Sequence, residues 1–380
     1  MMTETSTAID IEPHLEAIAA NAQSGRDGRR LDSGSIEILK QAGVFRSFLP
    51  KKLGGLEMSP QDFFAMQIKI AEADMSSGWV AGIIACHPYQ IALMDDQAQQ
   101  DVFGDDPDTL VSSSYNPMGG KVELADGGFK LSGRWGWSSG SDHCSWALLG
   151  AIVPGEGYRT FLVPRTDYVI EDTWHAMGLQ GTGSNDVVIA DPVFVPDHRT
   201  HKQFDGFACA NSQNNPYYDL PWAQVFIRIV CTPAIGAAKH ALALFIDNAG
   251  GSSTDPSKLM GDPDIQRRVA EVTMLIDETE ALMMRNFDMM TALIAKGDEV
   301  PLLDRVRFRY HASLVIDKMM AAVDTLFDVA GGRSVFNDSP IQAIWHDIHI
   351  ARAHVANNPT PFARNLGGIM LGGENGDFFV

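Results

Sequence analysis

The 380-residue sequence predicts a mainly helical α+β protein in which a small antiparallel β domain lies between two helical regions. Over residues 8–100, apolar residues recur at three- and four-residue intervals, the spacing of amphipathic helices. Over residues 127–199, short apolar runs alternate with Gly, Pro, Asp and Ser, which is typical of successive antiparallel strands. Helical patterns return after residue 218. We therefore expect three domains, over residues 1–110, 111–215 and 216–380.

Composition limits the class of protein and its partners. With 45% apolar and 20% charged residues, the chain has the make-up of a globular protein. A formal net charge of −19 disfavours nucleic acid and anionic membranes as partners, because both attract a basic face. We find no signal-peptide pattern and no apolar run of the roughly 18–20 residues that span a bilayer. The four cysteines are widely spaced and predict neither a disulfide framework nor a zinc site, so we expect a cytoplasmic protein.

The N-terminal region contains a lone histidine, His87, at the end of an apolar run. A histidine in such a position is more often a core or capping residue than a catalyst. Pro88 follows it directly and predicts an irregularity in the helix. Helical patterns in this region cover Pro13–Ser24, Ser33–Ala42, Pro60–Glu72 and Gly78–Leu93.

Two turns in the β region combine glycines with hydroxyl side chains. Trp135–Gly140 reads WGWSSG, and Gly178–Ser184 reads GLQGTGS. Glycine lets a backbone approach a ligand closely, and hydroxyl and N–H groups bind the edge of a heteroaromatic ring. The alternative is a pair of ordinary hairpin turns in which glycine supplies a positive φ. Ser114, at the end of a predicted strand, either lines a pocket or satisfies a turn.

The C-terminal region begins with long helical patterns over Trp222–Asn248, Pro263–Lys296 and Pro301–Val329. Antiparallel helices of this length predict a four-helix bundle. Charges at Arg305, Arg307 and Arg309 mark the third pattern, and Gly331 and Gly332 end it.

A metal site is disfavoured. His346 and His349 lie three residues apart on a stretch that we expect to be helical, where they could share a face. Asp347 and His354 could share a face of the same helix. The sequence nevertheless contains no HExxH motif and no paired Glu-x-x-His pattern. A GxSxG elbow and a P-loop are absent as well, and the Gly178 turn does not match the GxGxxG of a Rossmann site.

The order of the three regions resembles the acyl-CoA dehydrogenase fold over nearly the whole chain. GRWGWSSG is similar to the family's flavin turn of tryptophan and hydroxyl residues, and MGLQGTGSNDVVIADPVFVP to its second β motif. The resemblance implies a flavin cofactor, FMN or FAD, with Trp137 near the isoalloxazine and Ser139 at flavin N5. The other implied cofactor contacts are Ser138, Gly181, Thr182, Ser184, Gly331 and Gly332.

Two departures separate the chain from the dehydrogenases. Their Tyr-Glu-Gly-Thr motif supplies a carboxylate base, whereas HDIHIARAHVAN here places His354 at the Tyr and Val355 at the Glu. The Arg-x-x-Phe-Gly motif that grips the FAD pyrophosphate is also missing, which is compatible with FMN or an exchangeable flavin. The sequence instead resembles the oxygenase components of two-component flavin monooxygenases, such as the hydroxylases of 4-hydroxyphenylacetate and of phenolic steroids and the dibenzothiophene monooxygenase.

That resemblance rests on AEAD…CHP, RWxWSSG, MGLxGTGSNDV and WxDxHxxxxH. It implies that His87, Ser114, Ser139 and His354 line the flavin and substrate pocket. A separate NAD(P)H:flavin reductase would supply reduced flavin, which reacts with O2 to a C4a-hydroperoxyflavin and hydroxylates a small aromatic substrate, ortho to a phenolic oxygen.

In this reaction Ser139 would hold the flavin N5–H, while Trp135 and Trp137 would exclude water. His87 or His354 would take the phenol proton, with His87 favoured on the substrate side and Ser114 orienting the phenol oxygen. Three alternatives stay open: S- or N-oxygenation on the same flavin, an acyl-CoA dehydrogenase that uses Glu278 or Glu280, and a non-catalytic flavin-binding protein. The resemblance also implies a homotetramer.

Overall fold

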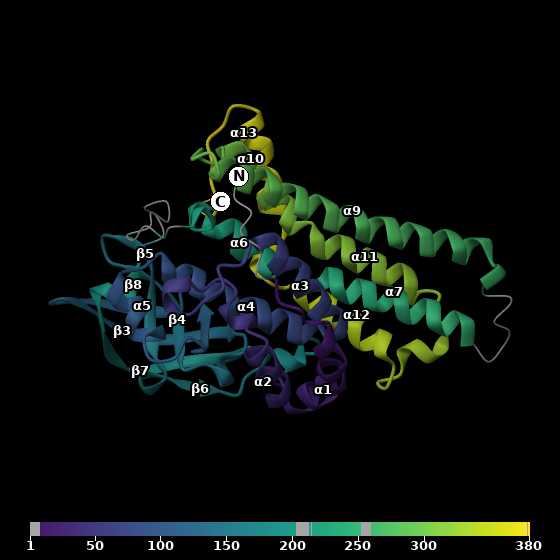
Figure 1. The fold of residues 1–380 in the computed structure, drawn as a ribbon, viewed down its shortest axis with the longest axis horizontal. Helices are drawn as coiled ribbons and strands as arrows, with labels where there is room; N and C mark the ends of the chain where they lie inside the picture. The colour runs from purple at the N-terminus through teal and green to yellow at the C-terminus, as the bar shows by residue number, and fades with distance from the viewer. Residues whose placement is uncertain (1–7, 203–212, 214, 252–259, 378) are drawn as a thin grey trace.

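The computed structural model describes residues 8–202, 213, 215–251, 260–377, 379 and 380. The β domain lies on one side of the molecule and the long C-terminal helices on the other, with most of the N-terminal helices between them (Figure 1). This arrangement confirms the predicted α+β class. The domain boundaries at residues 110 and 215 remain a prediction.

The N-terminal helices are fixed at their starts by side-chain caps. Asp32, Ser59 and Asp74 cap α2, α3 and α4, each by accepting a hydrogen bond from a backbone N–H of the first turn. Every residue of α4 is buried, and this helix continues through Pro88, which has no N–H to donate to the carbonyl of Ile84. The bounds are α1 (Leu15–Gly28), α2 (Ser33–Gln41), α3 (Pro60–Ala73), α4 (Met75–Ala92) and α5 (Asp96–Phe103).

In the described part of the β domain the strands form two four-stranded sheets, with strand orders β1-β4-β5-β8 and β2-β3-β7-β6. All the pairings are antiparallel except that of β1 with β4, which is parallel. Trp135 to Ser138 belong to a strand and not to a turn, because β3 extends to Ser138. The bounds are β1 (Val111–Ser114), β2 (Gly120–Ala125), β3 (Gly128–Ser138), β4 (Trp146–Val153), β5 (Gly157–Pro164), β6 (Val169–Glu171), β7 (Asn185–Pro196) and β8 (Thr200–His201).

The C-terminal helices are shorter than the sequence patterns suggested. The pattern from Trp222 divides before Pro233, and the pattern from Pro301 divides at Leu314. α7 and α11 pack on one another, on α9 and on α12. The bounds are α6 (Trp222–Ile229), α7 (Pro233–Gly251), α9 (Pro263–Ile294), α10 (Leu302–Ser313), α11 (Val315–Phe327), α12 (Pro340–Ala351) and α13 (Pro359–Met370).

One stretch, Trp222–Asn248, is long and apolar enough to cross a membrane by length and composition, contrary to our reading of the sequence. Within the tested window 67% of the residues are buried inside the molecule, as in the core helix of a globular protein. The apolar character of this stretch is therefore explained by its place between α3, α4 and α11.

Candidate active site

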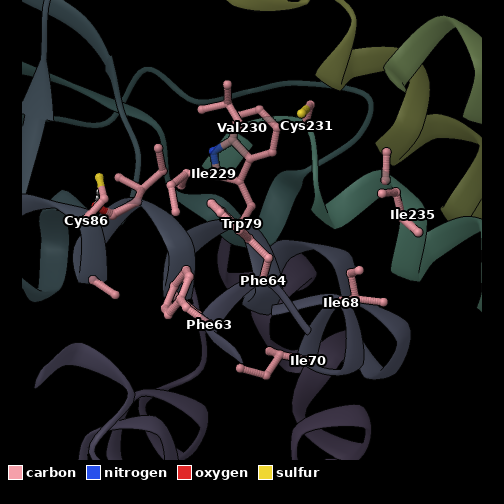
Figure 2. Packing of buried hydrophobic residues seen from close by; sticks show 14 of the residues in the cluster. Phe63, Phe64, Ile68, Ile70, Trp79, Cys86, Ile229, Val230, Cys231 and Ile235 are labelled. Carbon is pink, nitrogen blue, oxygen red and sulfur yellow. Dashed lines mark hydrogen bonds between the residues drawn. The ribbon is translucent and has the colours of Figure 1, made fainter. Parts of the chain in front are cut away.

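Three hydroxyl side chains and one indole form a connected cluster where the two predicted turns meet. Ser139 Oγ lies 2.8 Å from Ser184 Oγ, which lies 2.7 Å from Thr182 Oγ1. The indole Nε1–H of Trp79, on α4, donates to Ser139 Oγ over 3.1 Å. Figure 2 shows this indole reaching from α4 toward Val230. The structure thus brings Ser139, Thr182 and Ser184 together, as predicted, and adds Trp79.

The backbone explains why the two turns lie together. Gly140, in the left-handed region at φ 71°, donates its N–H to the carbonyl of Thr182 over 2.8 Å. Gly181 lies against α4, where a Cβ atom on it would come within 3.0 Å of the Ser76 Cβ. The glycine at 181 is therefore explained by packing of the chain on itself, while its contact with a cofactor remains a prediction.

His354 lies beside the cluster, just beyond the end of α12. Its ring meets the Trp79 indole edge-to-face at 5.9 Å between centroids. Its Nδ1 accepts a hydrogen bond from the backbone N–H of Ala356, which assigns the proton of the neutral ring to Nε2. Burial, with the Arg309 guanidinium as a second cause, lowers the pKa of His354 to about 4. At neutral pH this histidine is uncharged and can donate a hydrogen bond from Nε2.

His87 has the opposite tautomer. Its Nδ1 lies 2.6 Å from the carbonyl oxygen of Val111, which can only accept, so Nδ1 carries the proton. Its Nε2 is then a bare acceptor, and it is buried with no hydrogen-bond partner among the described residues. Burial lowers the pKa of His87 to about 4. A neutral imidazole with an unused lone pair is thus held on α4, two helical turns beyond Trp79.

Ser114 and His87 are attached to the same strand but do not bond to one another. The Ser114 hydroxyl donates to the carbonyl of Gly136 over 2.8 Å. The ring of Tyr115, the next residue, lies 6.3 Å from the His87 ring. His87 is held at the start of β1 and Ser114 is at its end, so the two side chains are fixed to different ends of this short strand.

The tryptophans of the first turn differ from each other in exposure. Trp135 is fully buried in the β domain and donates its Nε1–H to the carbonyl of Gly150, and its role in excluding water from the site remains a prediction. Trp137 is 73% exposed at φ 62° in the single chain. The Ser138 hydroxyl is buried and has no partner in the part of the chain that the structure describes. The cofactor contacts of Trp137 and Ser138 remain predictions.

Gly331 and Gly332 lie at the other end of α12 from His354. This helix has 12 residues, which corresponds to about 18 Å. A Cβ atom at either glycine would meet open space. The cofactor contacts of these two glycines remain predictions.

Asp347 ties the second turn to the helices, a role that we did not predict. Its Oδ1 accepts the backbone N–H of Leu179, and its Oδ2 lies 3.5 Å from an Arg26 nitrogen. The same Arg26 nitrogen lies 3.7 Å from the Asp74 carboxylate. Burial raises the pKa of Asp347 to about 6. Asp347 does not share a helix with His354, contrary to our expectation, because α12 ends at Ala351.

The other histidines of α12 serve in local contacts. His346 Nδ1 lies 2.9 Å from the carbonyl of Met177, and His349 stacks on Trp345 at 3.8 Å. Among the described residues, no group of three His, Cys, Asp or Glu side chains is arranged to hold a metal ion.

Comparison of the sequence with known proteins identifies the family to which the chain belongs. The model of the acyl-CoA dehydrogenase C-terminal domain matches residues 228–359. The flavin-dependent monooxygenase oxygenase subunit HsaA of Mycobacterium tuberculosis (strain CDC 1551 / Oshkosh) is 36% identical over 360 residues, which cover 92% of this chain and 91% of that protein. The oxygenase component of p-hydroxyphenylacetate 3-hydroxylase from Acinetobacter baumannii is 30% identical, covering 96% and 88%. The chain belongs to the flavin-dependent monooxygenases, as an oxygenase component.

A solved monooxygenase structure has the same fold throughout. The crystal structure of 3-HSA hydroxylase from Rhodococcus sp. RHA1 matches with a TM-score of 0.93 at 35% identity, covering 97% of each chain. The present chain, as an oxygenase component, takes a reduced flavin that a separate reductase supplies.

The described residues fit a flavin. The buried Ser139, Thr182 and Ser184 hydroxyls, with the unpartnered Ser138 hydroxyl, can bind the polar edge of such a ring. Bound reduced flavin would supply the electrons that activate O2.

The acyl-CoA dehydrogenase alternative is wrong. Glu280 is ion-paired with Lys239 between α9 and α7, and Glu278 is exposed on α9. Neither carboxylate contacts the Ser139 cluster, so neither can serve as the base that a dehydrogenase needs.

Proposed function

We propose that this monooxygenase hydroxylates a phenol at the position ortho to its hydroxyl group. The observation that carries the proposal is the state of His87, whose Nε2 lone pair is buried and unpartnered among the described residues. Attack on the ring makes the phenol O–H strongly acidic, so even a weak base with a pKa of about 4 can take its proton if a lone pair is placed there. A relative named p-hydroxyphenylacetate 3-hydroxylase acts at the ring position next to the hydroxyl group.

The tautomers divide the roles of the two histidines. His354 carries its proton on Nε2 and accepts from the backbone with Nδ1, so it has no free lone pair with which to act as a base. We assign the base to His87, and hydrogen-bond donation on the flavin side to His354. The Ser114 hydroxyl, which donates to the Gly136 carbonyl in this structure, would turn its proton toward the phenol oxygen when substrate binds, because the phenol O–H itself bonds to His87.

Labelled oxygen tests the proposal. The purified chain is mixed with NADH, a flavin reductase, FMN or FAD, ¹⁸O2 and 4-methylphenol, and the products are analysed by mass spectrometry. We expect a catechol that carries one ¹⁸O atom. Oxygenation of a thioether or an amine in place of the phenol would support the S- or N-oxygenation alternative. Hydrogen peroxide as the sole product, with every substrate tried, would indicate a flavin-binding protein without this activity.

A homotetramer in the cytoplasm, without nucleic acid or membrane as a partner, completes the proposal. Two observations support assembly. Gly331 and Gly332 border open space in the single chain, which fits a flavin contact that they supply to a neighbouring copy of the chain. Trp137, predicted to lie near the isoalloxazine, is exposed in a single chain. Light scattering coupled to size-exclusion chromatography measures the assembly directly.

A further inference from the structure

Three aromatic rings, Tyr115 and, on α6, Trp222 and Phe226, lead away from the proposed base, and we call them the aromatic wall. The Tyr115 ring, beside His87, meets Trp222 and Phe226 edge-on at centroid distances of 5.6 and 5.1 Å. Trp222 and Phe226 stack on each other at 4.9 Å, with 16° between their planes. A phenol whose oxygen is bonded to His87 would therefore have the Tyr115 ring, and the stacked pair behind it, as its apolar neighbours.

Phe379 closes the far end of this wall. Its ring meets Trp222 edge-on at 5.4 Å and Phe226 at 5.7 Å. It comes from the last described stretch of the chain, which lies beside α6 and α10 (Figure 1). A residue almost 300 positions after His87 thus packs on the same Trp222 and Phe226 rings.

Two arginines of α10 hold this stretch in place. Arg305 donates to the carbonyl oxygen of Val380 over 3.2 Å, and Arg309 Nε lies 3.7 Å from Asp377 Oδ2. The other oxygen of Asp377 accepts the backbone N–H of Phe379 over 2.9 Å. The charged run that the sequence shows at Arg305 and Arg309 is explained by this anchoring. A ring so fixed cannot easily move aside for a larger ligand.

We propose that Phe379 is a specificity-determining residue, whose ring sets how large a substituent a phenolic substrate can carry on the side away from its hydroxyl group. The inference rests on the proposed function, because it takes His87 and Ser114 as the place of the phenol oxygen. In an apolar pocket, a change of one methylene changes discrimination by roughly 10- to 200-fold. Removing a whole phenyl ring should therefore shift the preference toward bulky phenols.

The test compares 4-methylphenol with 4-cyclohexylphenol in the full chain and in F379A and F379W. Dissociation constants are measured by quenching of tryptophan fluorescence, and kcat/KM by catechol formation with a flavin reductase. We expect F379A to shift the ratio of affinities at least about tenfold toward 4-cyclohexylphenol, and F379W to shift it the other way. F194A is the matched control: Phe194 is exposed on β7, and this variant should keep the wild-type ratio.

A ratio that stays within about twofold of wild type in both variants would overturn the inference, as would failure of either phenol to bind the wild-type chain. If F379A does not fold, F379W decides alone, because the larger ring must still reduce affinity for the bulky phenol. The dissociation constants are measured by fluorescence and do not depend on catalytic turnover. A wild-type chain that binds both phenols but forms no catechol would therefore contradict the proposed function, while the shift in binding still tests Phe379.

Discussion

The two histidines of the site are held by partners of opposite kind. His87 faces a backbone carbonyl with Nδ1, and His354 faces a backbone N–H with the same atom. Burial lowers the pKa of both to about 4, so both are neutral at physiological pH. The two residues therefore share their type and their pKa. They differ in the backbone group that faces Nδ1, which is a carbonyl oxygen at His87 and an N–H at His354. One ring offers a lone pair at Nε2, and the other offers a proton.

The largest expected effect is the loss of the base in H87N. Asparagine can still donate to the Val111 carbonyl but has no basic nitrogen. We expect the rate of phenol hydroxylation to fall by about 10²- to 10⁴-fold, the usual contribution of a general base. Stopped-flow single turnovers with catechol detection measure this rate. An H87N variant within fivefold of wild type would remove His87 as the base.

The same variant tests the buried state of His87 through stability. Its pKa is about 4 in the folded chain and about 6.5 when exposed, so the unfolded chain takes up the proton first. The stabilising contribution is complete above pH 6.5 and is lost as the pH falls toward 4. H87N should lack this loss, which amounts to roughly 3 kcal/mol at pH 4. Urea unfolding of both proteins at pH 7 and pH 4.5 gives the difference, and parallel pH profiles would contradict it.

On the flavin side, S139A removes the acceptor of the Trp79 indole N–H and the partner of Ser184. A lost hydrogen bond costs about 1 kcal/mol, so we expect hydrogen peroxide release per turnover to rise by up to about tenfold. Peroxidase-coupled assays measure this release. S132A, on the same strand but outside the cluster, is the control, and an equal rise in both variants would speak against a specific role.

The smallest effect is expected for H354N. The asparagine oxygen can accept the Ala356 N–H, since asparagine is a preferred capping residue, and its amide can still donate. Hydroxylation should stay within roughly threefold of wild type, well below the loss in H87N, because no hydrogen bond is left unmade. If H354N instead falls as far as H87N, the assignment of donor and base is reversed.

The resemblance to the flavin monooxygenases implied that Ser139, Thr182 and Ser184 line one site, and the sequence predicted the order of regions from its periodicities. It misplaced Trp135, since a strand that continues through a WGW segment is not distinguished from a turn by composition. Trp79 was missed because a tryptophan in an apolar helix looks like core. The signal available was its position two turns before His87 on one buried helix.

Tertiary contacts decided the rest. The buried bonds of Asp347 to Arg26 and Leu179 join segments more than 150 residues apart, and no local pattern marks them. The sequence shows charges at Arg305 and Arg309 but not their surroundings, and Arg309 is buried. The ends of α6 and α10 were missed because the apolar pattern continues across each break.

The Asp347 contact has a consequence for protein engineering. The Leu179 turn takes its shape from a carboxylate on α12, which in turn lies beside an arginine on α1. The flavin-side loop is thus not a portable module: a graft of the two sheets alone onto another scaffold would leave the Leu179 amide without its acceptor. A shortened form of this enzyme must therefore retain α1 and α12 if the Leu179 turn is to keep its shape.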